Sequence, residues 1–306
     1  MIGLLTKLPN DVYIKKLEIA MVYPVDATVK DLLGSHLADI EKYLDADVLL
    51  FYGPILEGSE SFILEIIEQL AQDEKKKNIL YIVLTTPGGS AIAVERYVNI
   101  IRQHYNEVNF IVPDSAFSAG TIFCMSGDKI FMDYYSVLGP IDPQVNNKDG
   151  KLVPALGYLD KINELIIKSQ NDELSPAEFI ILKEYDLAEL RGYEQAKELT
   201  IDQLKKWLVK YKFKNWNTHK NGDSVTLKEK ISRAEEIAEK LSNTNLWKSH
   251  SRPINIEILE NDLKLKIEDF GKDKNLSSLI RNYHRLIVDY INKNGFNFFF
   301  HTRYFI

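Results

Sequence analysis

The stretch from Leu80 to Gln144 decides the fold, and it reads LYIVLTTPGGSAIAVERYVNIIRQHYNEVNFIVPDSAFSAGTIFCMSGDKIFMDYYSVLGPIDPQ. An apolar, β-branched run over 79–85 has the length and composition of a buried strand. A Pro-Gly-Gly turn follows at 87–89, and 91–104 predicts a helix because its apolar residues recur at helical spacing. A second short strand is predicted over 109–112.

A second turn, built from small residues, opens the next predicted helix. Residues 114–121 read DSAFSAGT. Strand, glycine turn, helix, strand, serine turn and helix are typical of two βα units side by side on a largely parallel sheet. Both turns then lie at the carboxyl ends of their strands, where α/β sheets usually place their sites.

The two turns suit acyl-transfer chemistry. Such a site needs a nucleophile held at a tight turn and backbone amides aimed at a developing oxyanion. Glycines present their amides without a side chain in the way, and a serine at a helix start benefits from the helix dipole. Either motif alone is more often an ordinary turn. It is the two together, at this spacing, that indicate a nucleophile site.

Three motifs carry a resemblance to known peptidases. TPGGS at 86–90, followed by AFSAG at 116–120, resembles the Clp protease proteolytic subunit and signal peptide peptidase A. SVLGPIDPQ at 136–144 resembles more specifically the serine dehydrogenase proteinase family, which has a Clp/crotonase fold. The resemblance is strong over 45–145, and it is traceable to about residue 270 through WKSHSRPI at 247–254.

The resemblance implies a nucleophile and an oxyanion hole. Ser118 matches the nucleophile. The amides of Gly88, Gly89 and Ala119 match the oxyanion hole. The resemblance therefore implies a serine peptidase that hydrolyses peptides through an acyl-enzyme on Ser118.

The general base is less clearly marked. In the Clp subunit a histidine follows the serine, but the matching segment here, 139–143, contains none. The serine dehydrogenase proteinase pattern is Ser, Asp and His in chain order, which implies Ser118, Asp142 and a later histidine. On the residues alone, Asp142 is equally well a turn residue between two prolines.

Two histidines compete for the role of base. His250, in SHSRPI before the last predicted helix of the fold, is the better candidate, and His219 is its rival. A Ser–Lys dyad, as in signal peptide peptidase A, stays open because no lysine is selected by its spacing. The remaining histidines are expected on the surface or outside the matched region: His36, His104, His284 and His301.

Composition fits an enzyme with a sizeable core. The chain has 306 residues, of which 45% are hydrophobic and 27% charged, enough for one large core or a core with a helical extension. A net charge of -6 without a basic stripe argues against nucleic acid as the partner. The single cysteine, Cys124, lies in an apolar stretch and is expected in the core. No metal-ligand spacing occurs, and this mechanism requires no metal or cofactor.

The fold predicted is α/β, a Clp/crotonase-like spiral of βα units with helical C-terminal additions. Further strands are predicted over 47–53 and 129–132, with a helix over 60–77 between the first and second strands. Later segments predict helices over 152–170, 175–211 and 226–241, and a short strand over 263–267. We expect a core with the nucleophile at 1–145, a helical region with the end of the core at 146–270, and a C-terminal tail at 271–306 whose aromatic end docks on a core or partner.

The expected location rests on sequence patterns that are absent, and the expected partners rest on the family resemblance. Residues 1–45 lack a signal-peptide pattern, and no stretch has transmembrane length, so a cytoplasmic protein without a membrane span is expected. The resemblance implies a peptide or protein substrate and a homo-oligomer. Two other functions stay open: a crotonase-like acyl-CoA enzyme, and a non-enzymatic assembly or binding protein with a degenerate protease fold.

Overall fold

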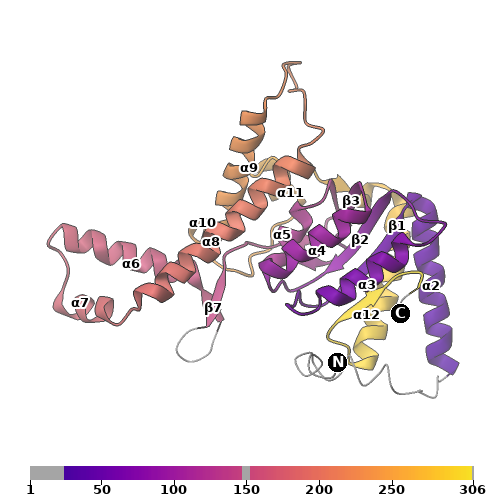
Figure 1. Ribbon diagram of the computed structural model, residues 1–306, viewed down its shortest axis with the longest axis horizontal. Helices are drawn as coiled ribbons and strands as arrows, with labels where there is room; N and C mark the ends of the chain where they lie inside the picture. Colours follow the sequence, from indigo (N-terminus) through magenta and orange to yellow (C-terminus); the bar gives the residue numbers. More distant parts are fainter. Residues whose placement is uncertain (1–23, 147–151, 305–306) are drawn as a thin grey trace. The chain divides into compact units, whose positions relative to one another are not determined.

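The computed structural model describes residues 24–146 and 152–304, which form two compact units. The first unit combines the chain up to Val137 with the chain from Asn255 onward. The second unit runs from Leu138 to Ile254 and is thus an insertion in the sequence of the first. Figure 1 traces both units in sequence colours.

A six-stranded sheet, in the order β10-β1-β2-β3-β5-β9, forms the centre of the first unit. Its strands are β1 (Asp47–Tyr52), β2 (Ile79–Thr85), β3 (Glu107–Ile111), β5 (Lys129–Met132), β9 (Glu268–Asp269) and β10 (Phe299–His301). All neighbours pair in parallel except β10, which runs antiparallel to β1. The parallel-dominated sheet with intervening helices confirms the predicted α/β class.

Helices cover both faces of this sheet (Figure 1). The first unit contains α2 (Pro24–Leu44), α3 (Glu60–Ala71), α4 (Ala91–His104), α5 (Ala119–Met125), α11 (Ile256–Asn261) and α12 (Lys274–Asn294). Alternate residues of β1 serve opposite faces, as the two-residue strand period requires. Val48 and Leu50 belong to the core cluster with α2 and α12, whereas the Phe51 ring contacts Tyr97 of α4 and Phe123 of α5.

Several bounds in the first unit agree with the sequence prediction, but one helix ends earlier than predicted. The strands predicted over 79–85 and 129–132 and the helix over 91–104 are confirmed with the same bounds. The helix predicted over 60–77 instead ends at Ala71. It ends there because the following residues turn, with the Asp73 carboxylate accepting the backbone amide of Lys75 at 2.9 Å.

For the C-terminal segment the sequence predicts a charged, aromatic tail, but the structure contains a helix and a strand there. It forms α12, capped by Asp273 at its start and by left-handed Gly295 at its end. The predicted docking of the aromatic end on a core is confirmed, because Phe299 and Phe300 are buried in β10 against β1.

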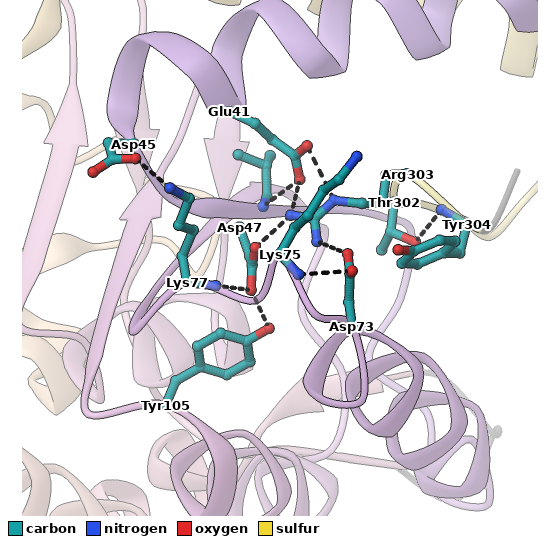
Figure 2. Close-up of polar contacts among 11 residues, drawn as sticks. Glu41, Asp45, Asp47, Asp73, Lys75, Lys77, Tyr105, Thr302, Arg303 and Tyr304 are labelled. Carbon is teal, nitrogen blue, oxygen red and sulfur yellow. Dashed lines mark hydrogen bonds and ion pairs between the residues drawn. The ribbon is translucent and has the colours of Figure 1, made fainter.

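A cluster of charged side chains fastens the end of the chain to the sheet (Figure 2). Arg303 binds Glu41 of α2 at 2.8 Å, Asp73 at 3.0 Å, and Asp47 at the start of β1. The Tyr105 hydroxyl donates to Asp47 at 2.8 Å. Burial raises the pKa of Glu41 from its usual value, opposed by the adjacent guanidinium. The network joins segments more than 250 positions apart in sequence.

The second unit is mostly helical. It contains the hairpin β7 (Gln144–Asn146) and β8 (Leu152–Pro154), followed by α6 (Ala155–Gln170), α7 (Pro176–Lys183), α8 (Leu187–Trp207), a π-helical turn (Leu208–Lys212), α9 (Leu227–Ser242) and α10 (Thr244–Trp247). The predicted helix start at Ser175 is confirmed: its hydroxyl oxygen accepts the Glu178 amide, and the Glu178 carboxylate reaches back in a capping box. Thr226 and Glu229 repeat this arrangement at α9.

Three helix and strand predictions were wrong in detail. The helix predicted over 175–211 is broken, because Asp186 accepts two backbone amides with its side chain and so starts α8 as a new helix. The helix predicted over 152–170 begins at 155, after β8. The strand predicted over 263–267 is absent: these residues alternate buried and exposed side chains, but β9 begins only at Glu268.

Two further short strands pair with each other, and the first of them lies within the turn that carries Ser118. They are β4 (Ser115–Ala116) and β6 (Val137–Leu138). The Val137 amide donates to the Asp114 carbonyl at 2.9 Å, which fixes the loop that leads from β3 toward Ser118.

Candidate active site

The glycine turn, residues 86–90, connects β2 to α4. Its glycines adopt φ angles of +103° at Gly88 and +142° at Gly89, in the region that favours glycine. A Cβ on Gly89 would lie 2.1 Å from the carbonyl oxygen of Ile55. Ser90 then caps α4, its hydroxyl oxygen accepting an amide of the first helical turn. Both conformation and space therefore require glycine here.

The serine turn, residues 114–119, connects β3 to α5. Ser118 has φ +52° and ψ −117°, torsions that a residue with a Cβ rarely adopts. Backbone strain of this kind costs about 1–3 kcal/mol and is concentrated at functional sites. The side chain makes no capping hydrogen bond, and the residue is partly exposed. The turn thus presents a hydroxyl that does not serve the helix it precedes.

The two turns contact each other directly within the first unit. The Thr86 amide donates to the Ser115 carbonyl at 2.9 Å, and the Phe117 amide donates to the Thr86 carbonyl at 3.0 Å. A Cβ on Gly88 would lie 2.8 Å from the Cβ of Ser118. The structure therefore brings together the two motifs that are about 30 residues apart in sequence.

Three backbone amides of the two turns are of interest, and they differ in how they are engaged. The Gly88 amide donates to the hydroxyl oxygen of Thr86 at 3.0 Å. Over residues 24–146 and 152–304, the amides of Gly89 and Ala119 have no hydrogen-bond acceptor. Ala119 is the first residue of α5, where a helix leaves its amides unsatisfied. These two amides are therefore donors that the described residues leave unpaired.

An acid–histidine pair occupies the second unit. Nδ1 of His250 lies 2.7 Å from Oδ1 of Asp142. The Asp142 side chain is 1% exposed and the His250 side chain 23%. The other carboxylate oxygen accepts from Gln144 Nε2 at 2.8 Å. In a neutral imidazole whose Nδ1–H donates to a carboxylate, Nε2 is the nitrogen that can accept a proton.

Backbone contacts explain how residues 108 positions apart meet. Leu138 and Ile254 form an antiparallel bridge with two hydrogen bonds of 2.9 Å. The Ile141 amide donates to the carbonyl of Leu241, at the end of α9, at 3.1 Å. The segment that carries Asp142 is therefore hydrogen-bonded to residues on both sides of His250 in sequence, Leu241 and Ile254.

The rival histidine has a different environment. Nε2 of His219 lies 3.0 Å from Glu229, an exposed residue of the α9 capping box, and the ring contacts that of Trp216. The pKa of Glu229 is lowered to about 2, chiefly by the Thr226 hydroxyl. His219 is thus part of a surface helix cap, whereas His250 is paired with a buried acid.

Two histidines of the C-terminal segment lie in the core of the first unit. Burial lowers the pKa of His284 and of His301 to about 4. His301 Nδ1 lies 2.7 Å from the Tyr283 hydroxyl, and His284 Nε2 lies 3.1 Å from the hydroxyl oxygen of Thr85, next to the glycine turn. His36 and His104 are half-buried in α2 and α4.

Other classes of site find no support among the described residues. Within 24–146 and 152–304, no three His, Cys, Asp or Glu side chains are grouped so that they could hold a metal ion. The predicted core position of Cys124 is confirmed, as the residue is buried. Across the same ranges, no helix combines the length and apolar character that a membrane crossing requires.

Comparison with known sequences places this geometry in a family. Residues 51–288 match the family described as ClpP-like SDH-type serine proteinases, and the chain belongs to that family. The resemblance inferred from the motifs and the ClpP-like fold are thereby confirmed. Membership supports a serine peptidase at the level of the family.

Curated relatives match over limited regions. Two uncharacterized proteins of Methanocaldococcus jannaschii are similar to the chain. One is 38% identical over 90 residues, which are 29% of this chain and 30% of that protein. The other is 26% identical over 179 residues, which are 58% of this chain and 49% of that protein. The chain thus spans about half the length, or less, of the curated relatives it matches.

Solved structures show weaker similarity. A mutant of the 1510-N membrane-bound stomatin-specific protease has 16% identity and a TM-score of 0.44, covering 75% of this chain and 82% of that one. A second mutant of it, in complex with a substrate peptide, has 19% identity and a TM-score of 0.43, covering 72% and 73%. A ClpP1 mutant from Listeria monocytogenes has 16% identity and a TM-score of 0.32, covering 54% and 75%.

Sequence reasoning singled out the glycines, Ser118, Asp142 and His250, but it missed two residues beside the glycine turn. Thr86 is marked in the sequence only as the first residue of the TPGGS motif, yet its hydroxyl oxygen accepts the Gly88 amide. His284 lies beyond the motifs that carry the family resemblance, so none of them marks it. The apolar spacing of 276–291, together with Asp273 before it and Gly295 after it, is the signal that could have identified α12.

Proposed function

We propose that this protein is a serine peptidase that cleaves peptide bonds through a covalent acyl-enzyme on Ser118. The observation that carries the proposal is the strained Ser118 turn packed against the glycine turn, with the amides of Gly89 and Ala119 unpaired among the described residues. A nucleophile and two preorganised donors are the parts that acyl transfer needs.

In this mechanism His250 is the general base. Its Nε2 takes the proton from the Ser118 hydroxyl as Oγ attacks the substrate carbonyl, and Asp142 holds the ring and stabilises the imidazolium. The negative charge that forms on the carbonyl oxygen is bound by the Gly89 and Ala119 amides. His250 then gives the proton to the leaving amine, and water releases the acyl group by the reverse steps.

The Gly88 amide has a supporting role in this proposal. Its hydrogen bond to the Thr86 hydroxyl fixes the turn that also carries the next amide, that of Gly89. If Thr86 rotates away from Gly88 when substrate binds, Gly88 becomes a third donor. The proposed oxyanion hole therefore keeps Gly88, Gly89 and Ala119, with Gly89 and Ala119 as the donors open in this structure.

We also propose that the protein acts on peptides or proteins and forms a homo-oligomer, as the family resemblance suggests. The mechanism requires that His250 Nε2 reach Ser118 Oγ, although the two residues belong to different units. A fluorophosphonate probe, which reacts preferentially with activated serine hydroxyls, tests the proposed nucleophile. Labelling is expected in the native protein and absent in Ser118→Ala.

Two histidine variants identify the base. His250→Ala should lower the labelling rate by about 10²–10⁴-fold, the usual contribution of a general base. His219→Ala, which removes a surface histidine of the same unit, serves as the matched control and should label at the native rate. Labelling that survives Ser118→Ala rejects the nucleophile, and loss of labelling in His219→Ala alone rejects His250. A native protein that is never labelled would favour the non-enzymatic alternative.

A further inference from the structure

We infer that α12 is the positioning element of this site, holding the glycine turn through His284 and the serine turn through Arg281. The inference rests on the proposed function, because it assigns the spacing of the two turns to a helix outside both motifs. His284 and Arg281 are positioning residues, since they act through Thr85 and Pro113 respectively.

The first of the two contacts of α12, here called its arms, joins His284 to the end of β2. His284 Nε2 lies 3.1 Å from the hydroxyl oxygen of Thr85, and both residues are buried. The Thr85 carbonyl also accepts the amide of Gly53 at 3.0 Å. Thr85 directly precedes Thr86, whose hydroxyl engages the Gly88 amide. The imidazole thus fixes the residue from which the glycine turn departs.

His284 is suited to hold a hydroxyl. Burial, reinforced by the positive charge of Arg281, lowers the pKa of His284 to about 4. At neutral pH the ring therefore carries one N–H donor and one acceptor nitrogen and no charge. A neutral ring can bond to Thr85 without the cost of burying an ion.

The second arm runs from Arg281 to the end of β3. Nη1 of Arg281 donates to the carbonyl oxygen of Pro113 at 2.6 Å, and Nη2 pairs with the buried carboxylate of Asp133. Pro113 comes directly before the serine turn. The guanidinium is also flanked by the rings of Tyr135 and Phe270, at 5.3 and 5.7 Å. Three kinds of contact therefore restrain this side chain.

The two arms act from one rigid helix. Arg281 and His284 are three residues apart, so they lie on neighbouring positions of one helical face. The rotation of α12 is set by its core residues, which include Ile280, Tyr283 and Ile287, all fully buried. Because one element holds the ends of both β2 and β3, the distance between the oxyanion donors and Ser118 depends on α12.

The test removes one hydroxyl. Thr85→Val keeps the shape of the side chain and loses the bond to His284, whereas Thr85→Ser keeps the bond. Tyr283→Phe is the matched control, because it removes a buried hydroxyl of α12 that faces His301 instead of the site. Each variant is labelled with the fluorophosphonate over a range of probe concentrations.

In Thr85→Val we expect the maximal labelling rate to fall about tenfold, because small displacements of an oxyanion site are costly, while the half-saturating probe concentration changes less than twofold. Thr85→Ser should recover most of the rate, and Tyr283→Phe should match the native protein. A Thr85→Val protein that labels at the native rate overturns the inference. So does a Tyr283→Phe protein that loses as much as Thr85→Val.

A second measurement separates this inference from the proposed function. Hydrogen–deuterium exchange of peptides covering 86–90 and 114–119 reports the order of the two turns without any chemistry. Faster exchange at 86–90 is expected in Thr85→Val but not in Tyr283→Phe. If the native protein is not labelled, the peptidase proposal fails, and exchange still decides whether α12 positions the turns. Unchanged exchange in Thr85→Val rejects the positioning role.

Discussion

The backbone torsions of Ser118 position its hydroxyl, but they are strained and therefore lower the free energy of unfolding. The strain is retained because Thr86 and Gly88 pack against the turn from the other motif. Stability and function therefore make opposite demands on this position, as is common where a site depends on strain.

Replacing Ser118 should separate its effect on stability from its effect on function. In Ser118→Gly, relief of about 1–3 kcal/mol of strain is opposed by about 0.5–1 kcal/mol of added chain entropy, so we expect a gain of about 1 kcal/mol in the free energy of unfolding. Ser118→Ala keeps the Cβ and should stay near the native value. Urea unfolding followed by circular dichroism measures both. A loss of stability in Ser118→Gly would show that the torsions carry no strain.

Gly88 is the second residue of the site that cannot be replaced freely, because no space is left for a side chain. A methyl group there would lie 2.7 Å from the Phe117 carbonyl oxygen as well as 2.8 Å from Ser118 Cβ, at a φ that disfavours side chains. Gly88→Ala should lower the fluorophosphonate labelling rate at least tenfold and cost about 1–3 kcal/mol of stability.

The matched control for Gly88→Ala is Gly157→Ala in α6. Nothing lies within 4 Å of a Cβ placed on Gly157, and alanine favours a helix by about 0.5–1 kcal/mol over glycine. This variant should keep the native labelling rate. Equal labelling by the two alanine variants would contradict the role given to the glycine turn.

At the scale of elements, the break between α7 and α8 depends on one side chain. Asp186 accepts the amides of Ala188 and Glu189, which α8 would otherwise leave unpaired. Asp186→Ala should destabilise the start of α8 by about 0.5–2 kcal/mol.

The chain provides an internal reporter for this prediction. All three tryptophans, Trp207, Trp216 and Trp247, belong to the second unit, so their fluorescence follows that unit. The unfolding midpoint read by tryptophan should fall in Asp186→Ala, and Asp186→Asn, which keeps a capping oxygen, should restore most of it. A midpoint that stays at the native value in Asp186→Ala falsifies the cap assignment.

The sequence predicts an element well where local pattern and contacts agree. The run over 79–104 has a β-branched strand, a glycine turn and a spaced apolar helix, and each appears with its predicted bounds. Asp142 and His250 are predicted as partners only through family motifs, because backbone hydrogen bonds of Leu138 and Ile141 bring them together and leave no local pattern in the sequence. The hydrogen bond from His284 to Thr85 joins residues 199 apart, and no periodicity encodes it.

At the scale of the whole molecule, two buried neutral histidines make stability sensitive to acid. The pKa of His284 and of His301 is lowered from 6.5 to about 4 by burial. Between these values the unfolded chain binds protons that the folded protein does not, so stability falls as the pH falls. The loss is absent above about pH 6.5, complete below about pH 4, and reaches about 3 kcal/mol for each histidine.

Equilibrium unfolding at pH 7, 6, 5 and 4 measures this dependence. The native protein should lose stability more steeply than the His284→Gln/His301→Gln double variant, whose side chains do not titrate in this window. The comparison also removes the contribution of carboxylates, which titrate in both proteins. Parallel pH profiles would show that these two histidines are not buried in neutral form.

The insertion of the second unit has a consequence for how the protein emerges from the ribosome. β1 finds its partner β10, and Asp47 its counter-ion Arg303, only after residues 138–254 have been translated. At about 5–20 residues per second, that delay is roughly 6–25 s. During it, the apolar face that α12 later covers stays open on a nascent chain that already carries Ser118, so chaperones have a defined interval and a defined surface to protect.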